Sequence, residues 1–317
     1  MATPIFRPDM GSSPELAFQD LVAWADRLTL DTLPRGLRWL LRRDDPQAWL
    51  DSLPEILQTC AETWDLSFGQ PLYGGTTSLV VEARLANGTE AVLKVQYPDR
   101  EVANEAAALI AWGGSGAVRL LDHDSKLHVL LLERCVPGMK LSMFGGSADA
   151  VIDALVDLVP RLWVAPRPPF DNLKDEAAFW VTRITNEWDT ERPWDKRVRD
   201  AAIDALESLG PTQGEQVLLN QDLHGDNILS SDRAPWLVID PKPLIGERDF
   251  SVAPIVRSYE LGHTRAAVVH RLDRLTSDLG LDRERTRLWA IGQTLAWSRW
   301  SKYRWAYVQT VRWLMDA

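Results

Sequence analysis

Two short apolar runs, residues 228–230 and 236–239, place the strongest constraint on how this chain folds. The residues between them, 231–235, are rich in turn-forming types, so the pattern predicts a small β-hairpin. A symmetric hairpin brings Asn227 opposite Asp240, because these two residues flank the runs. An amide oxygen beside a carboxylate is a pair of hard oxygen ligands of the kind that Mg²⁺ accepts. The sequence therefore predicts a metal site at Asn227 and Asp240.

Asp222 precedes Asn227 by five residues and should lie across the loop that leads into the hairpin. Asp-x-x-x-x-Asn, followed by a strand that ends in Asp, is the spacing at which kinases place their base and metal ligands. The motif alone is weak, because Asp and Asn are common loop residues that bond to their own backbone. Adding Asp240 leaves the kinase and plain-loop interpretations evenly balanced, with Asp222 as the candidate base.

The N-terminal half contains a possible phosphate-covering loop. Residues 72–83 have the pattern of strand, glycine turn and strand, and Asn87-Gly88 then marks a hairpin before residues 91–95. Glycines let backbone N–H groups approach phosphate oxygens, and Ser78 adds a hydroxyl. A Gly-Gly pair in a hairpin is, however, more often only a turn.

Lys94 stands in mid-strand between apolar neighbours, where a lysine needs a partner or an open face. Residues 101–112 follow as a predicted helix and offer Glu105 as the partner, with Glu101 as its rival one turn away. Lys94 with Glu105 matches the strand lysine and helix glutamate that hold the α- and β-phosphates in kinases.

The next segments are expected to form two more strands, 117–121 and 128–134, and then a mostly helical region from residue 151. The proline-rich stretch 241–250 is predicted to help form an acceptor pocket, with Glu247 and Asp249 binding a polar or cationic acceptor. The alternative for these two is comparably strong: Asp249 would cap a helix near Ser251, and Glu247 would be solvated.

The sequence resembles the aminoglycoside phosphotransferase superfamily, most closely its streptomycin 6-kinase and hydroxyurea phosphotransferase branch. The resemblance is carried by residues 222–227 and 236–247 and covers the chain from about Trp64 onward. It implies that backbone groups near Leu132 and Arg134 bond the adenine edge. One departure is that Asn220-Gln221 stand where the family usually has His-Gly before the catalytic Asp. Because the Asp itself is retained, this change affects the expected packing of the loop more than the expected chemistry.

Composition narrows the partners and the compartment. The net charge of −10 argues against nucleic acid, because a phosphate backbone demands a basic surface. Two cysteines are too few for a disulfide framework, and neither a signal peptide nor a membrane-spanning apolar run is present in the sequence. We therefore expect a cytoplasmic protein with a small-molecule partner.

These observations predict an α+β, bilobal protein-kinase-like fold. The expected parts are an N-terminal arm and helices at 1–56, a small antiparallel-sheet lobe with the hinge at 57–134, and a helical lobe at 135–317. The expected reaction is ATP- and Mg²⁺-dependent phosphorylation of a small-molecule hydroxyl. A non-catalytic nucleotide-binding module is disfavoured because no key residue is missing. A protein kinase is disfavoured because no Ala-Pro-Glu segment follows Asp240.

The acceptor is expected to be an aminoglycoside of the streptomycin type or an amino sugar, with hydroxyurea or another small neutral hydroxyl compound as the alternative. Streptomycin carries two guanidinium groups, so a site for it should present several carboxylates. The candidates in this sequence are Glu247, Asp249, Glu260 and Asp316.

Overall fold

The computed structural model describes residues 18–31, 33–72, 77–299 and 301–317, so the predicted glycine turn at 74–75 lies outside the described residues. The chain divides into two compact units. The small unit contains residues 1–99 and 120–134, and the large unit contains residues 100–119 and 135–317.

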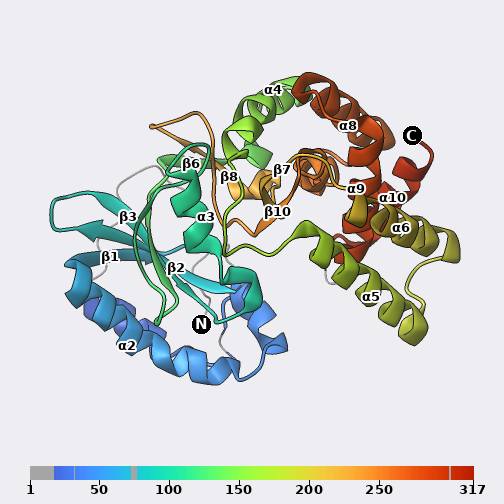
Figure 1. The fold of residues 1–317 in the computed structure, drawn as a ribbon. Coiled ribbons are helices and arrows are strands. Elements are labelled where there is room, and N and C mark those ends of the chain that lie inside the picture. Colours follow the sequence, from blue (N-terminus) through green and yellow to red (C-terminus); the bar gives the residue numbers. More distant parts are fainter. Residues whose placement is uncertain (1–17, 32, 73–76, 300) are drawn as a thin grey trace. The chain divides into compact units, whose positions relative to one another are not determined.

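The small unit is built on a five-stranded antiparallel sheet with the strand order β1-β2-β3-β5-β4 (Figure 1). Its strands are β1 (Leu66–Pro71), β2 (Ser78–Leu85), β3 (Glu90–Gln96), β4 (Leu120–Asp124) and β5 (Val129–Glu133). Gly88 turns β2 into β3 with a φ of 85°, a conformation that costs glycine little. The helical elements of this unit are α1 (Phe18–Ala25), η1 (Arg35–Arg42) and α2 (Pro46–Trp64).

Helix α2 packs its apolar stripe on the sheet. Leu50, Leu53 and Leu57 recur at helical spacing and join a core cluster with sheet residues such as Val81 and Leu93. The helix begins at Asp45, whose side chain accepts a hydrogen bond from a backbone N–H of the first turn at 3.3 Å. Burial of this stripe stabilises the packing of α1 and α2, the two α-helices that precede the sheet.

The large unit is mostly helical. Its helices are α3 (Glu105–Trp112), α4 (Ala148–Leu158), α5 (Leu173–Glu191), α6 (Lys196–Leu209), α7 (Ala253–Val256), α8 (Arg265–Leu279), α9 (Arg283–Ser298) and α10 (Arg304–Met315). Helix α9 is the central one, because its Trp289, Ala290 and Leu295 are fully buried among residues of the surrounding helices. Gly292 permits close contact with α6, since a Cβ there would lie 2.5 Å from a methyl group of Leu206.

Two small sheets carry the loops of the large unit. One pairs β7 (Gln216–Asn220) with β10 (Pro243–Glu247), and the other has the order β6-β8-β9, formed by β6 (Pro137–Lys140), β8 (Ile228–Ser231) and β9 (Leu237–Val238). Short 3-10 turns link these elements. They are η2 (Arg100–Val102), η3 (Leu141–Met143), η4 (Val159–Leu162), η5 (Gly210–Thr212), η6 (Gly225–Asn227), η7 (Arg248–Phe250) and η8 (Tyr259–Leu261).

The expected antiparallel sheet followed by a helical region is confirmed, but several details differ. The predicted helix 101–112 begins only at Glu105, after η2. Residues 117–119 precede β4 and do not belong to the five-stranded sheet; Ala117 instead bridges to Val238 in the large unit. Residues 100–119, which the sequence placed with the small lobe, therefore group with the large unit.

No strand was predicted in the proline-rich stretch 241–250, yet residues 243–247 form β10, because they pair with β7 even though Pro243 opens the strand. The predicted β-hairpin of residues 228–239 is part of a three-stranded sheet, because β6 pairs with β8. Among the described residues, no helix is both long and apolar enough to cross a bilayer.

Candidate active site

The loop that holds Asp222 begins and ends at the same end of the strand pair β7–β10. Strand β7 ends at Asn220, and Pro243, the first residue of β10, is its register partner. Residues 221–242 therefore leave and re-enter one end of the β7–β10 ladder. Asp222 follows β7 by two residues, so the ladder fixes where its backbone lies.

Asn220 closes the base of this loop with its side chain. Its Oδ1 accepts hydrogen bonds from the backbone N–H groups of Asp222 and Lys242, both at 3.0 Å. The Gln221 N–H donates to the Lys242 carbonyl at 2.9 Å, and the Gln221 carbonyl accepts from Gln293 Nε2 at 2.7 Å. Asn220 and Gln221, the residues that depart from the family pattern, thus tie both sides of the loop together.

The predicted hairpin after the loop is present, with Ile228 of β8 opposite Val238 of β9. In this register Asn227 faces Ile239, whose N–H donates to the Asn227 carbonyl at 2.9 Å. The expectation that Asn227 lies directly opposite Asp240 is therefore wrong by one residue. Asp240 comes next with a φ of 50°, a left-handed conformation that cannot continue a strand.

Asn227 and Asp240 have the chemistry of a Mg²⁺ site. Asn227 Nδ2 donates to the Asp222 carbonyl at 3.2 Å, so the amide presents its oxygen on the other side. Both residues are half-buried, which suits ligands that share a metal with a phosphate group. An amide oxygen and a carboxylate are hard donors, so the pair fits Mg²⁺ better than a soft transition metal.

Three cationic or potentially cationic groups surround the Asp222 carboxylate. Lys242 Nζ lies 3.6 Å from Oδ2, while Arg257 Nη2 and His224 Nε2 lie 3.6 Å and 3.7 Å from Oδ1. Arg257 and Lys242 are functional candidates that the motif search missed. The sequence does hold a signal for Arg257, because it is a lone charge at the end of the apolar run 250–256.

His224 and Glu260 form a partly buried pair next to this carboxylate, with Nδ1 and Oε1 2.8 Å apart. Burial opposes a charge on His224, but ionised Asp222 and the bond to Glu260 outweigh it and raise the His224 pKa above 6.5. Burial likewise opposes a charge on Glu260, yet the hydrogen bond and charge of His224 lower its pKa to about 2. Glu260, predicted to bind the acceptor, therefore has its carboxylate engaged by His224.

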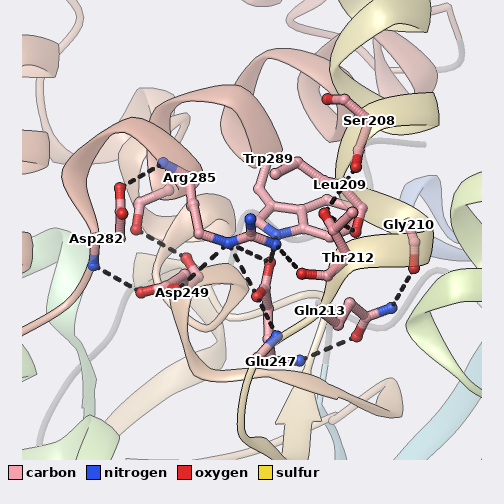
Figure 2. Close-up of polar contacts among 12 residues, drawn as sticks. Ser208, Leu209, Gly210, Thr212, Gln213, Glu247, Asp249, Asp282, Arg285 and Trp289 are labelled. Atoms are coloured by element: carbon pink, nitrogen blue, oxygen red, sulfur yellow. Dashed lines mark hydrogen bonds and ion pairs between the residues drawn. The ribbon is translucent and has the colours of Figure 1, made fainter.

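Glu247 lies at the far end of the β7–β10 ladder and is 1% exposed, so the alternative that it is solvated is wrong. Figure 2 shows its carboxylate surrounded by donors. Arg285 reaches it with Nη2 at 2.8 Å and Nε at 3.1 Å, the Gly214 N–H donates at 2.9 Å, and Trp289 Nε1 donates as well. These bonds satisfy both carboxylate oxygens.

Asp249 belongs to the same network (Figure 2). Its Oδ1 accepts a hydrogen bond from the backbone N–H of Asp282 at 2.7 Å, which anchors the start of α9. The expectation that Asp249 caps a helix near Ser251 is therefore wrong, because its carboxylate reaches a helix distant in sequence. Burial raises the pKa of Asp249 more than this hydrogen bond lowers it. Asp316, the fourth predicted carboxylate, is exposed and pairs with Arg197 at 3.1 Å.

The residues predicted to hold the nucleotide fall in both units. In the small unit, Ser78 opens β2 and Lys94 lies in β3, each 5% exposed. Leu132 lies in β5, and Arg134 directly after it pairs with Glu82 at 2.5 Å. In the large unit, Glu105 is the first residue of α3 and is 1% exposed.

Solved structures with a similar fold identify the fold class of this chain. A choline kinase from Streptococcus pneumoniae superposes with a TM-score of 0.61 at 14% identity, covering 83% of this chain and 98% of that one. A thermostable mutant of an aminoglycoside phosphotransferase, solved with ADP and hygromycin B, gives a TM-score of 0.60 at 14% identity, covering 82% and 98%. The predicted protein-kinase-like fold is therefore confirmed.

Sequence comparisons place the chain within that class. Residues 63–307 match the aminoglycoside/hydroxyurea antibiotic resistance kinase family, and the chain belongs to this family. It is 36% identical to a streptomycin 6-kinase from Streptomyces griseus over 81% of this chain and 85% of that one. It is 37% identical to a hydroxyurea phosphotransferase from Kitasatospora aureofaciens over 80% and 74%. The resemblance drawn from the motifs is confirmed.

Proposed function

We propose that this protein is an ATP-dependent kinase that phosphorylates a hydroxyl group of a small molecule. The observation that carries the proposal is that one loop and its hairpin gather Asp222, Asn227 and Asp240 at a single end of the β7–β10 ladder. Membership of a family of antibiotic resistance kinases supports the same reaction class.

In this proposal Asp222 orients the acceptor hydroxyl and takes its proton as the oxygen bonds to the γ-phosphorus and the bond to ADP breaks. His224 is not needed as the base, because its Nδ1 is engaged by Glu260. Asn227 and Asp240 would hold Mg²⁺, which when bound neutralises charge on the phosphates. Their fixed backbone positions supply the orientation on which phosphoryl transfer depends.

Five further residues are proposed to bind the nucleotide. Lys94 and Glu105 would fix the α- and β-phosphates, and Ser78 would add a hydroxyl. The backbone at Leu132 and Arg134 would bond the adenine edge, as the family resemblance implies. Burial of Lys94 and Glu105 supports these roles, because charged groups are rarely buried without a specific use.

For the acceptor we propose an aminoglycoside of the streptomycin type or an amino sugar. A streptomycin 6-kinase from Streptomyces glaucescens, 33% identical over 81% of this chain, supports this choice beside the Streptomyces griseus relative. A small neutral hydroxyl compound such as hydroxyurea is the second candidate, favoured by one observation. The carboxylates of Glu247, Asp249 and Glu260 already have partners of their own, so they offer little to an incoming guanidinium.

The test is ADP release by the purified protein with ATP, Mg²⁺ and one acceptor at a time: streptomycin, hydroxyurea and simple amino sugars. We expect streptomycin or an amino sugar to stimulate ADP release, a chelator to abolish it, and Asp240→Ala to abolish Mg²⁺-dependent turnover. No stimulation at saturating streptomycin, beside turnover of a neutral compound, would contradict the aminoglycoside choice. ATP turnover that Asp222→Asn leaves unchanged would contradict the kinase mechanism itself.

A further inference from the structure

Arg257 is a buried arginine with an unusual set of neighbours. It directly follows α7 and is 2% exposed. Its guanidinium carbon lies 4.8 Å from the ring centroid of Trp297 and 5.2 Å from that of Tyr307. Its Nη1 donates to the Tyr307 hydroxyl at 2.8 Å. Two aromatic rings and one hydroxyl therefore hold a planar cation in a single orientation.

The remaining donors of Arg257 are not satisfied in the usual way. Within the described part of the chain, Nε and Nη2 have no hydrogen-bond partner. Nη2 instead faces Asp222 Oδ1 at 3.6 Å, a distance of ion pairing without a hydrogen bond. A buried guanidinium with unmet donors is costly, so this placement calls for a reason other than stability.

Arg271 in α8 provides the contrast. It is 3% exposed, but its two terminal nitrogens donate to four backbone carbonyls at 2.8–3.1 Å. Those bonds join the segment 256–262 to α8, which is a structural task. Arg257 is as deeply buried as Arg271, but one of its terminal nitrogens forms an ion pair with Asp222, the candidate base. Burial of an arginine alone therefore does not account for Arg257.

We propose that Arg257 is a positioning residue for the Asp222 carboxylate, an inference that rests on the proposed kinase function. Arg257 and His224 both face Oδ1 and Lys242 faces Oδ2, so Arg257 helps to fix the rotation of the carboxylate that meets the acceptor hydroxyl. Tyr307 of α10 sets the orientation of Arg257 and links the C-terminal helix to the base. The long ion pair lets the carboxylate keep its capacity to accept a proton from the acceptor hydroxyl.

The test compares Arg257→Ala, Arg257→Lys and Tyr307→Phe with Arg271→Ala, the matched loss of a structural buried arginine. We expect Arg257→Ala to lower kcat about 100-fold with little change in the KM for ATP, because misplacing a reacting group costs this much. Guanidinium chloride at millimolar concentration should restore part of the turnover of Arg257→Ala. It should not raise the turnover of Arg271→Ala, whose defect is a lower Tm.

Arg257→Lys and Tyr307→Phe change fewer atoms and keep the inference testable if Arg257→Ala does not fold. Both should lower kcat about tenfold, since each leaves the carboxylate a less well-fixed partner. Turnover in Arg257→Lys and Tyr307→Phe within about twofold of wild type would overturn the inference. So would failure of guanidinium to raise the turnover of a folded Arg257→Ala protein.

Crystal structures of the wild type and Arg257→Lys separate this inference from the proposed function. The Asp222 side chain should keep one orientation in the wild type and rotate in the variant. An unchanged Asp222 orientation would overturn the positioning role, whatever the substrate is. Absence of turnover by the wild type with every acceptor would contradict the proposed function, and the two structures would still decide the role of Arg257.

Discussion

The two ends of the β7–β10 ladder hold carboxylates with opposite surroundings. At one end, Glu247 accepts hydrogen bonds from Arg285, Trp289 and the Gly214 N–H, and its side chain is 1% exposed. At the other end, the Asp222 side chain is 15% exposed and its cationic neighbours all lie at 3.6 Å or more. Among the described residues, no hydrogen bond reaches the Asp222 carboxylate.

The difference shows how to tell a structural carboxylate from a reactive one. A fully bonded buried carboxylate contributes to stability only while all of its donors remain, and it has no lone pair left for a substrate. A carboxylate near cations but without hydrogen bonds retains its acceptor capacity and has its charge stabilised at a distance. Sequence reasoning proposed both Glu247 and Asp222 for the site, and the structure favours only Asp222.

The largest expected effect is on turnover at the Asp222 end. Asp222→Asn should lower kcat by about 10³-fold, because general-base catalysis contributes about 10²–10⁴-fold. The KM for ATP should change little, because in the proposed mechanism the Asp222 side chain does not contact the nucleotide. The Tm should fall, because buried Arg257 loses its counter-charge. Steady-state kinetics and thermal unfolding of the variant check both parts. A kcat near that of the wild type would remove Asp222 from its role as the base.

The second effect is on stability at the Glu247 end. Glu247→Gln should lower the free energy of unfolding by about 3–5 kcal/mol, because it removes the charge of a buried carboxylate that Arg285, Trp289 and the Gly214 N–H all bind. Glu284→Gln is the matched control, since Glu284 also pairs with an arginine of α9, Arg287, but is exposed. That surface pair should contribute only about 0–1 kcal/mol. Denaturant titration measures both changes, and equal losses in the two variants would contradict the contrast.

A raised acceptor KM in folded Glu247→Gln, without a loss of stability, would restore the acceptor-binding role that the sequence suggested. The structural role predicts the reverse, namely a less stable protein whose folded fraction binds the acceptor normally. The two roles are therefore separated by measuring stability and acceptor KM on the same preparation.

Local patterns explain what could be predicted from the sequence. The turn chemistry of residues 231–235 and the flanking apolar runs are sufficient to identify the hairpin, and the fixed spacing from Asp222 to Asn227 identifies the loop. The apolar stripe of α2 and the Asn87-Gly88 turn are local in the same sense. Each of these features is decided by residues within a few positions of one another.

The environments of the carboxylates could not be predicted, because their partners are distant in sequence. Arg285 is 38 residues from Glu247, and Glu260 is 36 residues from His224. Strand β10 was missed because its propensity is poor and only the pairing with β7 makes it a strand. The one-residue error at Asp240 arises because the chain leaves the hairpin there through a left-handed residue, which hairpin symmetry does not predict.

A third, smaller effect concerns the nucleotide. Glu105→Gln should raise the KM for ATP about tenfold and lower kcat if Glu105 serves Lys94, because the lysine would lose its orienting charge. Glu101→Gln is the matched control, because it removes the same charge four residues earlier in the sequence. Initial rates at varied ATP concentration compare the two variants. A larger effect at Glu101 would move the partnership of Lys94 to that residue.

The last expected effect is a pH dependence confined to the Asp222 end. The His224 pKa is raised above 6.5, so its share of stability is complete below pH 6.5 and is lost as pH rises through the folded pKa. The Glu260 pKa is lowered from 4.5 to about 2, so its share is present above pH 4.5 and is lost as pH falls from there. The pair should therefore stabilise the protein most between pH 4.5 and 6.5.

Glu260→Gln tests this window, because glutamine keeps the shape and removes the charge. We expect the variant to be less stable by about 1.5–3 kcal/mol within the window, the size of a hydrogen bond to a charged group. The deficit should shrink as the pH rises through the His224 pKa and the ring loses its charge, and the measurement is Tm against pH for both proteins. The Glu247 end should show no such loss between pH 6 and 9, because arginine keeps its charge there. A deficit that does not shrink as the pH rises from 5 would contradict a charged His224, and a raised acceptor KM would return Glu260 to the acceptor site.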